Sequence, residues 1–491
     1  PQTPNPKPQT PNPKPQFFKF QKTPSQKQKA KSEAKKVETS FIMQMSQEAF
    51  LKKLQLSSQQ LDFTDEIRFV AEKEERLQSI RDLHDMLSNN TMLTRLILPN
   101  LEFVITMIKK NIFRPLPVVK KQGVAGEMMA NDEEETILDP SWPHLQPIYD
   151  FFLQLVICEA VDMKSLKAHI SQKFIQEFLE LFDSEEPKER EYLKNILHRL
   201  YAKLVPRRKM IRKTITDIFS TLVHEIYRFN GTSELLDIMA AIISGFAVPL
   251  REEHIIFFKN VIVALHKVQT CHKFHNELLR CSMLFLSKDP SLSSFLIEGL
   301  LKFWPFANYA KETLFLADLL DILEVSSDMA LLEKLSPKIF KRLVQCIASP
   351  HLQVSDRTMC FFEHEFFLKI VKQFKHHAFP LLVPVVNELA ETHWHKLIKE
   401  SLIALKNIIR NIDPVLYDNC AAEKQPPLIY LTKTPDELKQ IRRPVEQKWA
   451  QIEEKVRSLD PSFPPIKVPY SETHIVGDFN GLQNGNILYI D

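Results

Sequence analysis

Few side chains in this sequence are spaced for chemistry. The nearest approach to a metal site is CHKFH, where Cys271, His272 and His275 stand close together. A structural zinc site needs four ligands, and no second half of such a site stands near this one. The sequence therefore predicts no metal site and no cofactor.

Other polar clusters give no better case for catalysis. FEHEF places Glu363 and Glu365 two residues apart, which a helix would turn to different faces. THWH is predicted to be packing of His393 and His395 around Trp394. The patterns GxxxxGK[ST], GxSxG and HExxH do not occur, so three common enzyme classes lose support. We predict no catalytic residues.

A basic stretch, LKNILHRLYAKLVPRRKMIRK at 193–213, is the remaining candidate site. At ~100° per residue its leucines form one narrow stripe, with His198 and Tyr201 on the adjoining flank. Pro206 then breaks the helix, and the next one brings Arg208 and Arg212 nearby. Such a flank suits a short acidic peptide with apolar anchors, because Arg offers forked donors to carboxylate or phosphate. A solvated basic face explains the same spacing, so both interpretations stay open.

The elements that carry these residues are predicted to be helices throughout. The chain has 491 residues but only 8 glycines, and hairpin turns, barrels and phosphate-binding loops all need glycine. In ELLDIMAAIISGF, at 234–246, the apolar residues recur at i, i+3, i+4, i+7, i+8 and i+11, which is one helix face. Similar segments return at a loose period of roughly 40–47 residues, as in stacked helical pairs. The sequence predicts an all-α fold, a curved α-solenoid of HEAT-like helical pairs.

The chain divides by composition into four parts. Residues 1–40 are a Pro- and Lys-rich basic tail that cannot bury enough apolar surface to fold. The solenoid is predicted at 41–422, with an acidic loop at 123–141. A C-terminal helical extension follows at 423–460, and a flexible Pro- and Gly-containing tail at 461–491.

The charge and hydropathy of the chain do not favour nucleic acid or a membrane as its partner. The formal net charge is +3, and without the tail's nine Lys and two Glu the body carries about −4, which does not favour nucleic acid. No uncharged run reaches the ~18 residues that span a bilayer, so no membrane insertion is predicted.

Six cysteines without a CxxC pair indicate buried thiols in a reducing compartment. No apolar signal-peptide core begins the sequence, so we expect a cytoplasmic protein. The tail's lysines serve either as a nuclear address, in which case the protein also enters the nucleus, or for solubility.

Several long and unusual strings stand out in the sequence, of which LFDSEEPKEREYLKNILHRLYAKL at 181–204 is one of the longest. At this string, and from about 50 to 455 as a whole, the sequence closely resembles the B-prime family of regulatory subunits of protein phosphatase 2A. Others follow in family order: KNIFRPLP at 110–117, WPHLQPIYDFF at 142–152, NGTSELLDIMAAIISGFAVPLREEH at 230–254, LHKVQT at 265–270, LLKFWP at 300–305, SPHLQVSDR at 349–357 and THWHKLI at 392–398.

The resemblance implies a non-catalytic solenoid that binds the phosphatase 2A scaffold subunit and the phosphatase 2A catalytic subunit. It implies a groove that recruits substrate or adaptor proteins carrying a Leu-x-x-Ile-x-Glu motif. It also implies that the acidic loop with Asp132, Glu133, Glu134 and Glu135 lies towards the catalytic subunit; a solvated acidic loop is the alternative.

The residues of the groove, as the resemblance implies them, come from three segments. Tyr201, Ile238 and Ile242 would enclose the motif's isoleucine, and Arg251 and His254 would meet its glutamate. His198 and Arg199 would favour an acidic or phosphorylated neighbour. Arg208 would hold peptide backbone, with Arg212 beside it.

Two departures and one alternative remain. Asn195 stands where the family usually has Thr, and Arg251 where it usually has Lys, and both changes are expected to retune the groove without abolishing it. The alternative function is a HEAT-like adaptor or transport scaffold that binds other peptide cargo without the phosphatase.

Overall fold

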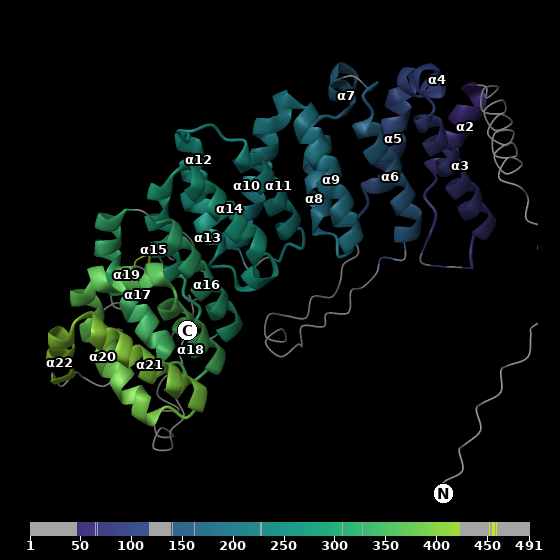
Figure 1. Cartoon of the computed structure of the whole chain (residues 1–491). Helices are drawn as coiled ribbons and strands as arrows, with labels where there is room; N and C mark the ends of the chain where they lie inside the picture. The colour runs from purple at the N-terminus through teal and green to yellow at the C-terminus, as the bar shows by residue number, and fades with distance from the viewer. Residues whose placement is uncertain are drawn as a thin grey trace, which may run out of the picture. The chain divides into compact units, whose positions relative to one another are not determined.

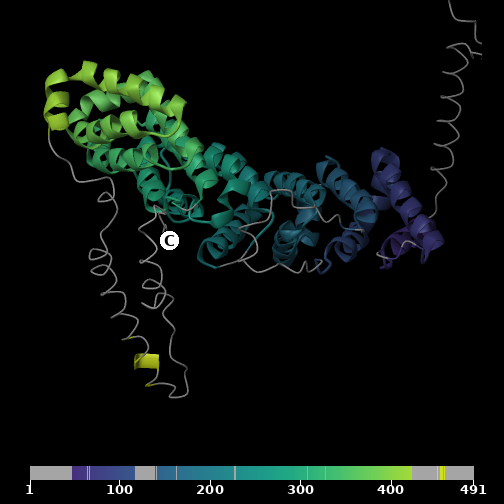
Figure 2. The same ribbon diagram turned by 90° about the horizontal axis from the view of Figure 1, so that it is seen from below.

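A computed structural model shows a chain that is built from helices throughout its described part (Figures 1 and 2). It describes residues 47–63, 65, 67–116, 139, 141–161, 163–225, 228–306, 308–326 and 328–422, with a few positions between 451 and 458. Within these ranges every regular element is a helix and no strand occurs. The predicted fold class, an all-α solenoid of stacked helical pairs, is confirmed.

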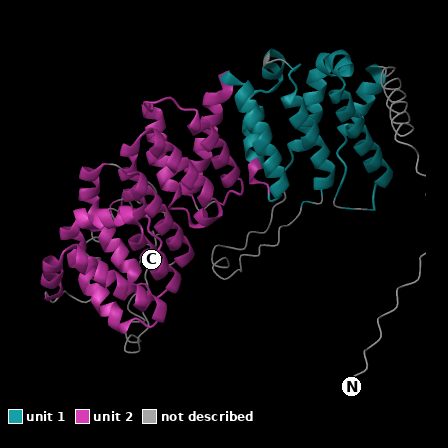
Figure 3. Cartoon of the chain, in the orientation of Figure 1, with its two compact units in different colours: residues 1–181, 185–205 teal, residues 182–184, 206–491 magenta. Residues whose placement is uncertain are grey.

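The described chain forms two compact units, coloured separately in Figure 3. Unit 1 comprises residues 1–181 and 185–205, and unit 2 comprises residues 182–184 and 206–491. The predicted acidic-loop residues Asp132 to Glu135, the tails at 1–40 and 461–491, and most of the extension at 423–460 lie outside the described residues. The domain boundaries therefore stay predictions.

Unit 1 is built from helices that pack in pairs. α2 contacts α3, α3 contacts α6, and α6 contacts both α5 and α9. The buried faces are apolar, as the periodicity predicted; Phe50, Ile108 and Phe152 are fully buried. The helices of unit 1 are α2 (Gln47–Ser57), α3 (Val70–Ser88), α4 (Asn90–Met92), α5 (Leu101–Ile112), α6 (Trp142–Ile157), α7 (Met163–His169), α8 (Gln172–Glu180) and α9 (Pro187–Lys203).

A buried ion network ties three segments of unit 1 together. The Arg114 guanidinium donates to Glu189 Oε1 at 2.7 Å and to Asp139 Oδ2 at 2.7 Å. Tyr149 Oη donates to the same Glu189 carboxylate at 2.6 Å. Burial would lower the pKa of Arg114, but the bonds to Glu189 and Asp139 more than offset it, and the net pKa is raised. The network joins the segment after α5 to α6 and α9.

Unit 2 repeats the same construction over a longer stretch. α11 packs against α14, α17 against α20, and α20 against α21. Side-chain caps mark several helix starts; Asn308 Oδ1 accepts from Lys311 N at 3.0 Å and Asp328 Oδ1 from Ala330 N at 3.1 Å. The helices of unit 2 are α10 (Arg208–His224), α11 (Thr232–Ser244), α12 (Glu252–Phe257), α13 (Val263–Leu265), α14 (His275–Lys288), α15 (Ser293–Lys302), α16 (Tyr309–Val325), α17 (Met329–Ile347), α18 (Leu352–Met359), α19 (Glu365–Gln373), α20 (Lys375–Thr392), α21 (Lys396–Ile412) and α22 (Pro414–Ala422).

Among the residues that the structure describes, one helical stretch, Asn90–Ile112, is long and apolar enough to cross a membrane by length and composition alone. Its apolar window is 56% buried, and its helix α5 packs against α2 and α6. The core of unit 1 therefore accounts for its composition.

The CHKFH residues Cys271 and His275 are buried in unit 2. His275 Nε2 faces Asp318 Oδ1 at 2.8 Å in a buried pair, while Cys271 is 1% exposed. Burial raises the pKa of the Cys271 thiol to about 12, so it stays protonated at neutral pH. Among the described residues, no three His, Cys, Asp or Glu side chains gather as metal ligands would.

The THWH segment lies at the surface of unit 2. The rings of His393 and His395 lie 5.8 and 5.2 Å from the Trp394 ring, as the packing interpretation expected. The Trp394 side chain is nevertheless 68% exposed. The two histidines bracket a surface indole, because the segment falls in the turn between α20 and α21 and not on a buried helix face.

We predict that the His275–Asp318 pair stabilises unit 2 in a pH-dependent way. Replacing His275 with Ala leaves a buried carboxylate unpaired, which typically costs ~3–5 kcal/mol. Burial lowers the pKa of His275, the bond to Asp318 raises it, and the net pKa is raised. A raised folded-state pKa gives stability that is present at low pH and is lost as pH rises through that pKa.

Urea unfolding of wild type and His275→Ala at several pH values measures this contribution. The difference in unfolding free energy should be largest on the acidic side of the His275 titration and shrink above it. In a double-mutant cycle, His275→Ala should cost much less once Asp318 is Ala. A difference that grows with rising pH would contradict the assignment.

Candidate functional site

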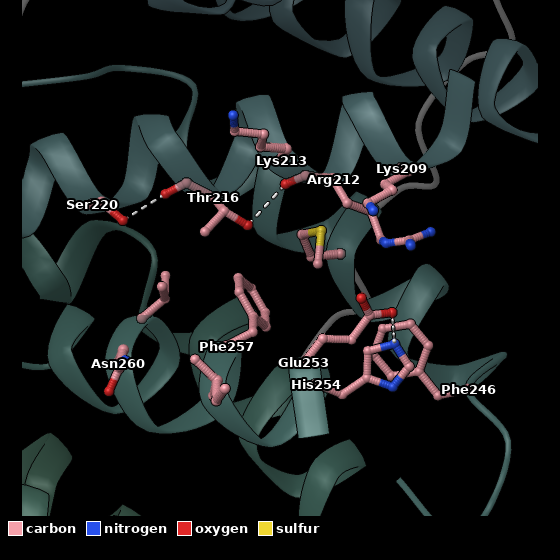
Figure 4. A pocket seen from close by; sticks show the side chains of 13 residues that line it. Lys209, Arg212, Lys213, Thr216, Ser220, Phe246, Glu253, His254, Phe257 and Asn260 are labelled. Carbon is pink, nitrogen blue, oxygen red and sulfur yellow. Dashed lines mark hydrogen bonds and ion pairs between the residues drawn. The ribbon is translucent and has the colours of Figure 1, made fainter. Parts of the chain in front are cut away.

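The candidate site in unit 2 is an open cavity of about 400 Å³ beside α10, α11 and α12 (Figure 4). Its α10 side carries Arg212, Thr216 and Ser220, which stand four residues apart and so share one face. Facing them are α12 and the π-helical turn Phe258–Ile262 that continues it. The full lining is Lys209, Arg212, Lys213, Thr216, Ser220, Met239, Phe246, Glu253, His254, Ile256, Phe257, Asn260 and Val261.

Close contacts at the N-terminal end of α11 hold this helix in place within unit 2. A Cβ added at Gly231 would lie 2.4 Å from the carbonyl oxygen of Phe182, so only glycine fits this approach. The neighbouring Asn230 backbone N–H donates to Asp183 Oδ1 at 3.0 Å, and its side-chain amide donates to the Asp183 carbonyl at 2.9 Å. These contacts explain why the NGTSELL string begins the helix where it does.

The other end of α11 places an aromatic ring in the cavity. Lys288 Nζ donates to the carbonyls of Ser244 at 3.0 Å and Phe246 at 2.9 Å, which caps the helix end. The Phe246 ring then stacks on His254 with centroids 3.7 Å apart and planes 2° from parallel. His254 is therefore held in place on one face by an aromatic ring.

His254 also faces an internal carboxylate. Its Nε2 lies 3.5 Å from Glu253 Oε1, and Arg251 Nη1 lies 4.0 Å from the same oxygen. Burial lowers the pKa of His254; Glu253 raises it, and Arg212 and Arg251 lower it, so the net pKa is lowered. At neutral pH the imidazole is thus mostly uncharged, and Figure 4 shows it beside Glu253 at one end of the cavity.

The nine residues predicted for the groove are distributed over both units. His198 and Arg199 are exposed on α9 in unit 1, and Tyr201 is half-buried there. The other six, Arg208, Arg212, Ile238, Ile242, Arg251 and His254, belong to unit 2. That all nine form one groove stays a prediction.

Within unit 2 the cavity includes only two of the six. Arg212 and His254 line it, whereas Ile238 and Ile242 are 2% and 7% exposed in α11 and do not. Arg251 is exposed, with 78% of its side chain accessible. Four other lining residues, Glu253, Thr216, Ser220 and Asn260, were not predicted from the sequence. The four-residue spacing from Arg212 to Thr216 and Ser220 could have indicated those two.

Comparison with known proteins gives the family. The family model described as protein phosphatase 2A regulatory B subunit (B56 family) matches residues 36–456. The chain belongs to the B56 family. Its relatives include the B′ alpha isoform of the 57 kDa phosphatase 2A regulatory subunit from Arabidopsis thaliana, 34% identical over 86% of this chain and 83% of the relative.

Two further relatives carry similar names. The B′ beta isoform from Arabidopsis thaliana is 36% identical over 76% of this chain and 74% of its own length. The delta isoform of the 56 kDa regulatory subunit from Homo sapiens is 33% identical over 87% of this chain and 69% of its own length. A solved engineered protein covers 82% of the chain with a TM-score of 0.30 and 14% identity, which carries no argument about the fold.

B56 membership settles two questions from the sequence. The resemblance to the B-prime family is confirmed, and the matched residues include all of the motif strings that suggested it. The family consists of regulatory subunits, so this chain is a regulator and not the phosphatase itself.

We predict that Glu253 raises the pKa of His254 and so opposes the larger lowering that burial causes. Replacing Glu253 with Gln removes the charge that raises the pKa of His254, so that pKa should fall further. An NMR titration of the His254 ring protons measures the shift directly. Glu252→Gln is the matched control, because Glu252 lies in the same first turn of α12 and the same charge is lost. An unchanged or higher His254 pKa in Glu253→Gln would contradict the assignment.

Proposed function

We propose that this chain is a substrate-selecting regulatory subunit of protein phosphatase 2A. In this role it binds the scaffold and catalytic subunits and recruits proteins that carry a Leu-x-x-Ile-x-Glu motif. The observation that carries the proposal is the B56 family match over 36–456, which spans nearly every described helix. The names of the relatives, all phosphatase 2A regulatory subunits, support the same partner.

The cavity in unit 2 supports the motif-recruiting part of the proposal. It has basic residues at its rim, Lys209, Arg212 and Lys213, and its lining includes buried apolar residues such as Met239 and Val261. A peptide that combines an acidic residue with apolar anchors complements both features. The motif's glutamate would compete with Glu253 for His254 and Arg251. The Glu253 side chain is half-exposed, so water could solvate it once it is displaced.

Co-purification tests the holoenzyme role. Tagged full-length protein expressed in eukaryotic cells should recover the phosphatase 2A scaffold and catalytic subunits in comparable amounts. Recovery of other cargo without either phosphatase subunit would refute the proposal and favour a solenoid adaptor of another kind.

Motif binding tests the recruitment role. Arg251→Glu combined with His254→Ala should weaken a Leu-x-x-Ile-x-Glu peptide by at least about tenfold, which corresponds to ~1.4 kcal/mol. The expected loss has two sources: the uncharged partner at His254 is removed, and an exposed positive charge beside the peptide's glutamate becomes negative.

Calorimetry with the full-length protein measures this affinity at low and high salt. The loss should shrink at high salt, because the reversed charge at the exposed Arg251 is screened. Arg81→Glu, a charge reversal at an exposed residue of α3, is the control and should bind like wild type. Unchanged affinity in the double variant would place motif recognition elsewhere on the chain.

A further inference from the structure

The cavity extends beyond the groove that the family resemblance implied. Only Arg212 and His254 belong to both, and they lie at one end of the cavity with Glu253 and Phe246 (Figure 4). From that end the lining continues along α10 through Thr216 to Ser220, and along the facing elements through Phe257 to Asn260. Part of the cavity is therefore not assigned to any residue of a Leu-x-x-Ile-x-Glu motif.

Its length fits a short stretch of extended peptide. Arg212 and Ser220 are eight residues apart on one helix, which at 1.5 Å per residue is about 12 Å. An extended chain rises ~3.3 Å per residue, so about three to four residues span that distance. The cavity volume of about 400 Å³ leaves room for at least one apolar side chain in addition to backbone.

The lining chemistry favours an apolar side chain. Met239 and Val261 are 2% and 4% exposed and form part of the lining, while Ile256 is 50% exposed and presents a large apolar surface. Covering Ile256 therefore contributes more binding free energy than covering Met239 or Val261, because more of its apolar surface still contacts water.

The polar lining suits a peptide backbone. The hydroxyls of Thr216 and Ser220 donate to the carbonyls of Arg212 and Thr216, each at 2.8 Å. With its proton committed to the helix, each hydroxyl oxygen can only accept, and peptide N–H groups are the matching donors. Lys209 and Lys213 on the rim favour an acidic chain over a basic one.

We propose that the motif groove continues past its glutamate into a subsite along α10 and α12. The occupant is the C-terminal continuation of the same motif peptide, with an apolar side chain within about four residues after the glutamate. This subsite selects, among motif-bearing partners, those whose motif is followed by an aliphatic residue. The inference rests on the proposed function, because the glutamate near His254 sets where the continuation begins.

Two synthetic peptides and two variants of the full-length protein test the subsite. One peptide is Leu-Ala-Ala-Ile-Ala-Glu followed by four alanines, and the other carries Ala-Leu-Leu-Ala after the same core. In the wild type the leucine-tailed peptide should bind about three- to tenfold more tightly, as partial burial of one aliphatic side chain implies. The gain should persist at high salt, because it is apolar.

Ile256→Ser should abolish that gain, so that the two peptides bind this variant within about twofold of each other. Ile256 is half-exposed, so the substitution is expected to leave the fold intact. Ile403→Ser is the matched control, since Ile403 is 44% exposed on α21 and does not line the cavity; the gain should remain there.

The outcomes separate the subsite from the function on which it rests. Equal affinity of both peptides for the wild type, or an equal gain in Ile256→Ser, overturns the subsite and leaves motif recruitment standing. A gain that disappears at high salt also overturns it, because the rim lysines would then carry the effect. If neither peptide binds the wild type, motif recruitment is refuted and the subsite falls with it.

Discussion

Most of the long helices in the described part of the chain have an apolar face that they cannot bury alone. In α11 the residues Leu235, Met239 and Ile243 form a stripe that is 0–2% exposed only because α14 and its neighbours cover it. The next helix faces the same constraint, so stacking continues from pair to pair along each unit. Stability thereby accumulates from nearest-neighbour contacts, and the residues off the stripe are free to vary. The basic residues along α10 and the acidic residues in the first turn of α12 lie off the buried stripes.

One group of buried polar side chains in unit 1 holds several segments in a fixed register. The Arg114–Glu189–Tyr149 network uses one residue from each of three strings that first suggested the family: KNIFRPLP, WPHLQPIYDFF and the string at 181–204. A buried carboxylate is costly unless its lone pairs are filled, and here Arg and Tyr fill them together. The strings therefore have a physical reason to occur together: losing one partner leaves the other charge buried and unpaired.

The fold was predictable because its signal is local. Glycine scarcity and a 3.6-residue apolar period are properties of short windows, and both survive without knowledge of tertiary contacts. Trp394 shows the limit. Its histidine neighbours indicated packing, and the rings do meet, but exposure depends on whether another helix covers the turn. The cavity shows the same limit. Asn260 and Val261 line it because they lie in a π-helical turn, and the apolar period of the sequence does not predict such a turn.

Glu253 is the residue that sequence reasoning had least means to place. In REEHII it is one of two adjacent acids, and nothing in the string separates them. In the structure its carboxylate lies against His254 and near Arg251, the two residues expected to receive a glutamate from a peptide. Glu253 thus offers these two residues a carboxylate from the same chain. A ligand gains only the difference between its own carboxylate and Glu253, so ionic contact alone gives modest affinity at this point. Selectivity must then come from what the charge cannot supply, which is apolar surface on either side of it.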